Sequence, residues 1–577
     1  MKKRILAALL ALCLVMLCAC SGDDTSSTSS AAGESSTATE SSEAGETSET
    51  GETSDVAETP TELPFGPDNP TELPFGPDNP IELTAAVNQS PIQGDFNEIQ
   101  ILKDYAEESG IHITYQNIPA SDVATQLSLM LNSGELPDIL MKMNVTSTDQ
   151  AKYSAEDLFV ALSDYPEYMP NLQSWFDQYP TAEQAMTQQD GKIYAAPYIL
   201  AGDAIRMGSK IWYNSDVLEK LNMEMPTTTD EFYEYLKAGK DLDYNENGQA
   251  DEIPLTSASI DEIVQVLMGS FGLMNRGSSH TNVFVDDNDE LAYAYTSENF
   301  REELRYLNKL YTEGLIDQDI FTNDYAQEIA KCSTGRALTF MMVNNSPVSN
   351  TPYEEYSFGF TEPLEGPNGD KTFGLYSLPA SDSGQFMITY TCEEKGEDAV
   401  IAAMTFMDHW YSEEGIITYF MGIKDVTYEE DPDSPGGLAL TDAVLNDPDG
   451  RTFEQVLAEY VPWAGGANPS VATNEYFKGG ETWPVCLEAV EGLVNYIPEE
   501  VWAPFTRFYT TDEASTMSST KTDLDTYMKE WQAYFITGER SLDDDWDEYV
   551  AGTENIGLSE YMEIYQKGYE AYQAEQG

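Results

Sequence analysis

The sequence predicts an α/β protein built on mainly parallel sheets. Between residues 81 and 141, short runs of alternating apolar and polar residues are interleaved with longer segments of helical periodicity. Gly110 and Pro137 separate successive segments. Strand, helix, strand, helix, strand is the order of a parallel sheet with covering helices. Longer helical patterns later in the chain add a helical C-terminal part.

The expected elements follow one another closely in this first region. We expect strands at 81–87, at 111–118 and from Asp138 onward, and helices at 96–109 and 121–132. Later helical patterns occupy 296–314, 397–420, 523–536 and 558–576, and 421–450 is expected to be irregular. Ligands of parallel sheets bind beyond the carboxyl ends of the strands, so a candidate cleft follows Val87 and Leu140.

The first twenty residues have the layout of a secretory signal. Three basic residues precede an apolar run that is too short for a membrane-spanning helix. Leu17-Cys18-Ala19-Cys20 resembles the lipobox of bacterial lipoproteins. The resemblance implies that Cys20 becomes the first mature residue and carries lipid. The chain would then work at the outer face of the cytoplasmic membrane, on the extracellular side, with the lipid as its membrane anchor.

Residues 21–80 are expected to form a disordered linker ahead of a folded body at 81–577. The stretch 21–60 contains almost no large apolar side chain, so burial cannot offset the entropy of ordering it. Residues 61–70 and 71–80 are identical copies of TELPFGPDNP, whose prolines favour an extended spacer. A duplication without a function explains the repeat equally well.

Charge and motif content disfavour several classes of function. The formal net charge of −74 disfavours nucleic acid and anionic membranes as partners. With 102 Asp and Glu residues, paired carboxylates do not single out a glycosidase site. The three histidines lie far apart, and no zinc-protease, serine-hydrolase, P-loop or dinucleotide motif occurs. We therefore expect no enzyme. Cys332, Cys392 and Cys486 imply no disulfide framework and are expected to be buried thiols.

Several segments together resemble the solute-binding lipoproteins of ABC importers, in particular the large oligosaccharide- and alginate-binding members. They are SGIHITYQNIP (109–119), LSLMLNSGELPDIL (127–140), DGKIYAAPY (190–198), WYNSDVLEKLNM (212–223), PTTTDEFYEYLKA (226–238), LYTEGLID (310–317) and FITGERSLDDDWDEYV (535–550). The resemblance implies a two-lobed fold of the type II periplasmic-binding-protein kind. Lobe one would comprise about 81–198 plus a later returning segment, and lobe two about 199–340 plus the C-terminal helices.

The same resemblance implies the function. A monomeric chain would capture an oligosaccharide between its lobes and deliver it to the transmembrane subunits of an ABC permease. A peptide ligand, a secreted surface glycoside hydrolase and an adhesin without a small ligand are the alternatives. The −74 charge favours neutral glycans over uronates.

The segment DLDYNENGQADEIPL (241–255) has the spacing of a calcium loop. Oxygen-bearing side chains alternate before Gly248, which allows a tight turn, and two carboxylates follow. The candidate ligands are Asp243, Asn245, Asn247, Gln249 through its carbonyl, Asp251 and Glu252. Pro254 replaces the bidentate Glu of an EF-hand, so Glu252 would take that role. Alginate-binding members of the family carry a similar loop, and a solvated turn without metal is the alternative. The Ca²⁺ would be structural.

Binding a sugar requires aromatic faces and hydrogen-bonding side chains. The candidates are Asn88, Gln89, Tyr198, Trp463, Trp483 and Trp502. Asn88 and Gln89 follow the first strand, and the three tryptophans lie in glycine- or proline-flanked segments. For each tryptophan, core packing is an equal alternative to ligand contact. Trp410, Trp531 and Trp546 lie in helical patterns and are expected in the core.

Overall fold

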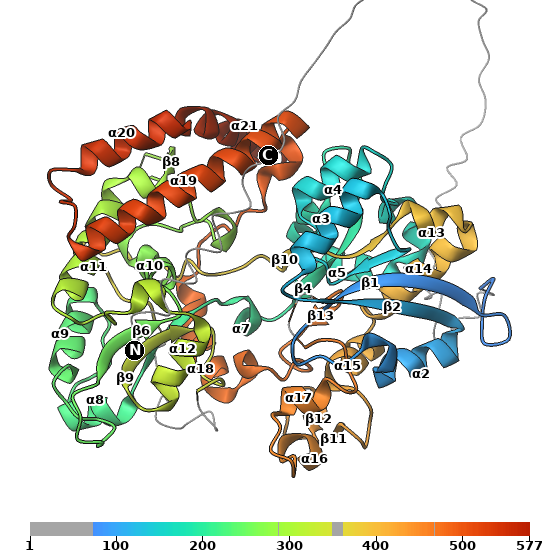
Figure 1. Cartoon of the computed structure of the whole chain (residues 1–577), viewed down its shortest axis with the longest axis horizontal. Coiled ribbons are helices and arrows are strands. Elements are labelled where there is room, and N and C mark those ends of the chain that lie inside the picture. Colours follow the sequence, from blue (N-terminus) through green and yellow to red (C-terminus); the bar gives the residue numbers. More distant parts are fainter. Residues whose placement is uncertain (1–72, 287, 349–361, 465, 467, 577) are drawn as a thin grey trace, which may run out of the picture. The chain divides into compact units, whose positions relative to one another are not determined.

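A computed structural model describes residues 73–286, 288–348, 362–464, 466 and 468–576 (Figure 1). These residues belong to one compact unit, Thr59–Gly577. Two main sheets, of six and three strands, each pack against helices around a separate apolar core. The predicted α/β fold with two lobes is confirmed. Cys20 and the signal segment lie outside the described residues. Within the described ranges, every helix is too short or too polar to cross a lipid bilayer.

The larger sheet has the strand order β13–β4–β10–β3–β1–β2. Its strands are β1 (Ile81–Gln89), β2 (Ile111–Pro119), β3 (Ile139–Met141), β4 (Ala195–Leu200), β10 (Ala380–Ile388) and β13 (Val471–Ala472). As predicted, β1 pairs in parallel with β2 and β3. Strand β10 runs antiparallel to β3 and β4, so the sheet is mixed. The reversal arises because the chain enters β10 at the carboxyl end of β4, where Ala380 pairs with Ile199.

Both faces of this sheet are covered by helices, and alternate strand residues supply two cores. In β1, Ala85 and Val87 join the core on one face, while Ala86 joins the core on the other. The first core includes α2 (Gln100–Ser109), α5 (Pro170–Gln178), α6 (Pro180–Met186), α14 (Glu397–His409) and α15 (Glu413–Met421). The second core includes α3 (Val123–Ser133) and α4 (Ser147–Ser154). Because β1 is buried on both faces, the consecutive residues Ala85, Ala86 and Val87 are all apolar.

The helix ends follow local chemistry. Gly110 and Gly134 stop α2 and α3 with φ of 74° and 72°, the left-handed conformation that glycine adopts readily. The predicted helix over 397–420 is two helices, α14 and α15. The break occurs because Ser412 caps α15 by accepting a hydrogen bond from the Gly415 N–H at 3.0 Å. Helix α13 (Tyr390–Glu394) precedes α14.

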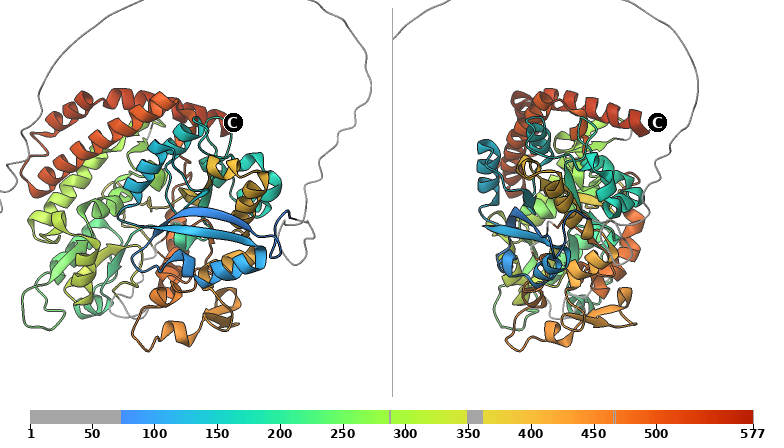
Figure 2. Two further views of the ribbon diagram at one scale, coloured as in Figure 1. Left: turned by 45° about the vertical axis from the view of Figure 1, so that its right-hand side comes forward. Right: turned by 90° about the vertical axis from the view of Figure 1, so that its right-hand side faces the viewer.

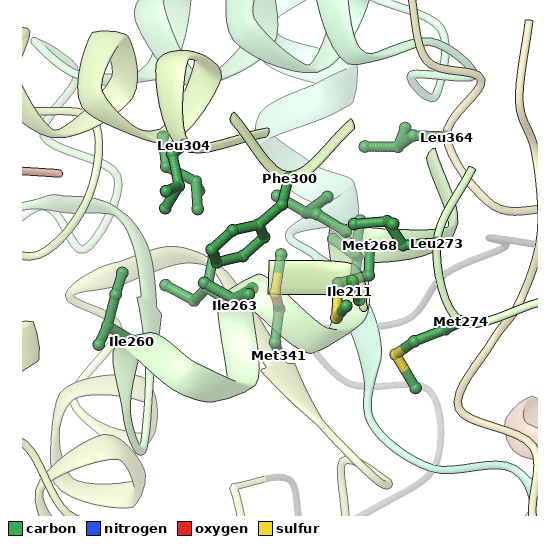
Figure 3. Packing of buried hydrophobic residues seen from close by; sticks show 14 of the residues in the cluster. Ile211, Ile260, Ile263, Met268, Leu273, Met274, Phe300, Leu304, Met341 and Leu364 are labelled. Atoms are coloured by element: carbon green, nitrogen blue, oxygen red, sulfur yellow. The ribbon is translucent and has the colours of Figure 1, made fainter. Parts of the chain in front are cut away.

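The smaller sheet has the order β5–β9–β6, formed by β5 (Lys210–Tyr213), β6 (Ile253–Ser257) and β9 (Ala337–Met342). Strand β9 pairs in parallel with β6 and antiparallel with β5. The surrounding helices are α8 (Ser215–Leu221), α9 (Thr229–Gly239), α10 (Ile260–Leu267), α11 (Glu298–Thr312), α12 (Tyr325–Ser333) and α18 (Pro484–Leu493). Their apolar faces meet in one core, where Phe300 lies among Ile263, Leu304 and Met341 (Figure 3).

The C-terminal part is helical, as predicted. Helices α19 (Thr511–Thr537), α20 (Trp546–Ile556) and α21 (Leu558–Gln576) complete the core of the smaller sheet. They lie together beside α11 (Figures 1 and 2), and Asn308 of α11 donates a hydrogen bond to the Phe535 carbonyl at 3.0 Å. Trp531 and Trp546 are buried here, and Trp410 is buried in the other core, which confirms the three core predictions.

Short elements complete the described chain. The segment 421–450 is less irregular than expected, because β11 (Tyr428–Glu430) and β12 (Leu438–Leu440) form a hairpin. Helices α16 (Asp442–Leu445) and α17 (Phe453–Leu457) follow it. A second hairpin joins β7 (Val283–Val285) and β8 (Leu291–Tyr293).

The chain passes between the two sheets at 201–209, between the end of β9 and the start of β10, and at 473–483. The first contains α7 (Asp203–Arg206) and pairs with the end of the second. The Gly208 N–H donates to the Leu375 carbonyl at 2.8 Å, and the Ser377 N–H donates to the Arg206 carbonyl at 2.9 Å. The Arg206 side chain also donates to the Ser377 carbonyl at 2.8 Å. Two crossings are therefore joined by main-chain hydrogen bonds.

The described residues begin at Leu73, ahead of the predicted start of the folded body at Ile81. Phe75, in the second copy of the decapeptide, is 8% exposed and packs in the core of the larger sheet. The Gly76 and Asn79 backbones bond to each other at 2.9 and 3.1 Å, and this turn lies against Gly110. A disordered linker over the whole of 21–80 is therefore wrong at its end, because one buried aromatic ring anchors the last residues of the spacer.

Candidate functional site

Polar side chains lie at the carboxyl edge of the larger sheet, where β1 ends. The Gln89 amide donates to the carbonyls of Gln93 at 3.1 Å and Gly94 at 2.9 Å, so it stabilises its own loop. The Oδ1 of Asn88 is buried and has no hydrogen-bond partner among the described residues. Buried polar atoms are normally paired, so this oxygen is an exception at the end of β1.

A buried lysine holds a second segment against the same edge. Lys142 follows β3 and is 1% exposed, and its ammonium donates to the Pro462 carbonyl at 2.6 Å and to Asn468 Oδ1 at 2.9 Å. Burial lowers the pKa of Lys142 to about 7. The Gln93 amide also donates to the Val461 carbonyl at 3.1 Å. Trp463 is thereby positioned at the carboxyl ends of β1 and β3.

Trp463 combines an aromatic ring with an unused donor. It is 7% exposed, and its ring packs against Phe420 and Phe477, with centroids 6.4 and 5.7 Å away. Its Nε1 is buried and has no partner among the described residues. The predicted residues Asn88 and Trp463 thus present an unpaired acceptor and an unpaired donor at one sheet edge.

The other predicted ligand residues lie in different surroundings. Trp502 is 1% exposed and packs in the core of the smaller sheet against His280 and Tyr569, and its Nε1 donates to Glu500 at 3.2 Å. This environment favours the packing alternative for Trp502. Trp483 is half-buried at the end of the third crossing, immediately before α18. Tyr198 lies within β4 and is 8% exposed.

The carboxyl edge of the smaller sheet is acidic. Ser257 ends β6, and its hydroxyl donates to Glu262 Oε2 at 2.5 Å, while Ser209 donates to Glu262 Oε1. Glu328 of α12 is 1% exposed, and its Oε1 has no partner among the described residues. Burial and the nearby Glu262 raise the pKa of Glu328 to about 9. Lys142 and Glu328 were not predicted from the sequence, since neither lies in a distinctive motif.

The predicted calcium loop connects α9 to β6 and folds back on itself. Both oxygens of Asp243 accept loop N–H groups, from Asn247 at 3.0 Å and from Gly248 at 2.9 Å. Gly248 has a φ of 75°, as the tight turn requires. Asn245 Oδ1 accepts from the Asn247 N–H at 3.1 Å, and Asn247 Oδ1 accepts from the Gln249 N–H at 2.7 Å.

Two observations bear on whether the loop fits a cation. Glu252 Oε1 is buried without a partner among the described residues, while its Oε2 accepts from the Asp251 N–H at 3.1 Å. Within the described ranges, no three His, Cys, Asp or Glu side chains converge as a metal site. A cation here would therefore need amide and main-chain oxygens in addition to carboxylates. Such a mixed oxygen set suits Ca²⁺, so the donor chemistry fits.

The chain matches one protein-family model. Residues 93–417, more than half of the chain, match the family described as bacterial extracellular solute-binding protein. A curated relative is the fructooligosaccharide ABC transporter substrate-binding protein FusA of Streptococcus pneumoniae serotype 4. It is 27% identical over 513 residues, which cover 85% of this chain and 90% of FusA.

Solved structures show the same fold. A FusA EF-hand mutant from S. pneumoniae in complex with fructo-nystose superposes with a TM-score of 0.69 at 24% identity, covering 86% of this chain and 100% of FusA. The alginate-binding protein AlgQ2 without calcium ion gives a TM-score of 0.68 at 20% identity, with 86% of this chain and 100% of AlgQ2 covered.

Proposed function

Because this chain belongs to the bacterial extracellular solute-binding proteins, we propose that it captures an oligosaccharide between its two lobes for an ABC importer. This family comprises binding proteins, not enzymes, which excludes the hydrolase alternative. Lobe one would be about 81–198 with the returning segments around β10 and β13. Lobe two would be about 199–340 with the C-terminal helices. Ligand would favour the closed form by contacting both lobes.

The observation that supports a sugar ligand most directly is that Asn88 and Trp463, at the carboxyl edge of the larger sheet, each have a buried polar atom without a partner among the described residues. A buried acceptor and a buried indole N–H without partners suit the hydroxyl groups of a sugar. The relative FusA is described as a fructooligosaccharide-binding protein, which supports the same ligand class. The carboxylate of Glu262 at the carboxyl edge of the smaller sheet favours neutral sugars over uronates, because it would repel a second carboxylate.

A glycan panel tests this function. We expect neutral oligosaccharides, including fructo-oligosaccharides such as kestose, to raise the melting temperature, whereas oligouronates and peptides leave it unchanged. Replacing Trp463 with Ala should weaken the binding of the responding sugar about tenfold or more, which is about 1.4 kcal/mol. Trp463→Phe retains a ring and separates stacking from the Nε1 hydrogen bond, and Leu129→Ala, on an exposed site, serves as the control. A protein that responds to peptides alone would contradict the proposal.

We also propose a membrane tether and a structural Ca²⁺. Cys20 would carry lipid and hold a monomeric body at the outer face of the cytoplasmic membrane, where it meets its permease. The ligands of Ca²⁺ would be Asp243, Asn245, Asn247, Asp251, Glu252 and the Gln249 carbonyl. The ion would fix the connection between α9 and β6, and no part in chemistry is assigned to it.

Metal removal tests the second proposal. Chelation by EGTA should lower the melting temperature, and added CaCl₂ should restore it, because an ion that binds the folded state alone stabilises that state. Asp243→Asn should reduce both effects, since Asp243 supplies the first carboxylate of the loop. An unchanged melting temperature across chelator and metal would contradict the calcium proposal.

A further inference from the structure

Arg336 reaches the calcium loop from the start of β9. Its Nε lies 3.2 Å from Asp251 Oδ2 and also donates to the Asp251 carbonyl at 3.2 Å. The other carboxylate oxygen of Asp251 accepts from the Asn247 amide at 3.0 Å. Both oxygens of the Asp251 carboxylate therefore have partners within the protein, and the Asn247 side chain is one of these partners.

The backbone of Arg336 is held firmly at this place. Its carbonyl accepts from the Ile253 N–H at 2.7 Å and from the Tyr244 hydroxyl at 3.0 Å, within the β6–β9 pairing. The sheet thus delivers the guanidinium to the loop. Another cation close by, Lys331, is engaged elsewhere, because its ammonium lies 2.6 Å from Asp317.

The guanidinium also has room to leave the loop. An open cavity of about 430 Å³ adjoins the loop and is lined by Asn247, Asp251, Gln327, Lys331 and Arg336. The Arg336 and Asp251 side chains are 37% and 31% exposed, so their ion pair is partly hydrated and contributes little free energy. A divalent cation can therefore displace it.

We propose that Arg336 is an internal competitor for the cation of this loop. It neutralises Asp251 in the metal-free protein and lowers calcium affinity, and it moves toward the cavity when Asp251 turns to the ion. This inference rests on the proposed calcium site. As a consequence, the loop responds to calcium at a higher concentration than its carboxylates alone would set.

Calorimetric titration of CaCl₂ into chelator-treated protein tests the proposal. Arg336→Gln should bind Ca²⁺ about three- to tenfold more tightly than the wild type, because a half-exposed ion pair no longer has to be broken. The melting temperature gives a second measurement. Without calcium, the variant should melt slightly below the wild type, and the stabilisation by added calcium should be larger in the variant.

Lys220→Gln is the matched control. Lys220 lies 3.7 Å from Glu246 of the same loop, so its removal changes the local charge equally without freeing a proposed ligand. Tighter binding by Arg336→Gln alone supports direct competition. An equal increase in calcium affinity in both variants would show a general charge effect and overturn the proposal. Unchanged or weaker calcium binding by Arg336→Gln would also overturn it. Absence of binding in every variant overturns the calcium site itself, whereas wild-type binding with an unchanged Arg336→Gln variant overturns the competition alone.

Discussion

Replacing Phe300 with Ala should lower the free energy of unfolding by about 3–5 kcal/mol, the range for truncating a buried phenylalanine. Phe300 is fully buried in the core of the smaller sheet, and its ring centroid lies 5.1 Å from that of Tyr295. Figure 3 shows its ring between side chains of α10, α11 and β9, so the lost volume would leave a cavity at the centre of this core. Calorimetry and urea unfolding measure the effect.

The expected calorimetric result also reports on the two lobes. The cores of the two sheets are separate clusters, so Phe300→Ala weakens one of them directly. If the lobes unfold independently, a low-temperature transition should separate from the main one. Tyr325→Ala, on an exposed site in the same lobe, is the matched control and should change stability by no more than about 0.5 kcal/mol. A loss below about 1 kcal/mol for Phe300→Ala would contradict this account of the core.

Between pH 7 and pH 4 the free energy of unfolding should fall by about 3 kcal/mol less in the variant His280→Gln than in the wild type. His280 is 3% exposed, and its Nε2 donates to the Ala503 carbonyl at 3.0 Å, so its Nδ1 accepts from the Tyr565 hydroxyl. Burial lowers the pKa of His280 from 6.5 to about 4. The unfolded chain therefore takes up this proton as the pH falls through 6.5, while the folded chain resists protonation until about pH 4.

The contribution of neutral His280 is complete above pH 6.5 and is lost progressively between pH 6.5 and 4. Urea unfolding at pH 7 and pH 4 measures it as the difference between wild type and variant. Asp408, whose pKa is raised to about 7 by burial, titrates in both proteins and cancels in this difference. His112→Gln, at a half-exposed position, is the control for the substitution itself. Equal acid sensitivity in wild type and His280→Gln would disprove the assignment.

Local patterns predicted most of the first lobe. The alternation in 81–87 and the stops at Gly110 and Gly134 depend on neighbours in sequence, and β1, α2, β2, α3 and β3 occur within a few residues of the expected bounds. The antiparallel entry of β10 could not be predicted in this way, because its direction depends on a crossing more than thirty residues long. Phe75 was missed for a related reason. Its decapeptide occurs twice, and composition does not indicate which copy meets a core.

The candidate site was predicted less completely. Asn88 was found because it follows a recognisable strand, and Trp463 because it lies between Pro462 and a glycine-rich turn. The same reasoning selected Trp502, whose burial comes from helix α21, far away in sequence. The role of Lys142 could not be predicted, because the carbonyl that its ammonium contacts lies more than 300 residues away in sequence. The structure shows where these side chains lie, and their contact with a ligand stays a prediction.

The low reactivity expected of the native thiols allows introduced cysteines to be labelled selectively, so that the distance between the lobes can be followed. Within the described residues, Cys332, Cys392 and Cys486 form no disulfide and are buried, and burial raises the pKa of Cys392 to about 12 and of Cys486 to about 11. Thiolates react with maleimides and thiols do not, so these side chains should stay unlabelled under mild conditions. New cysteines at the exposed positions Leu129 and Tyr325, one on each lobe, would accept a fluorophore pair selectively. Energy transfer between them would then report opening and closing in solution.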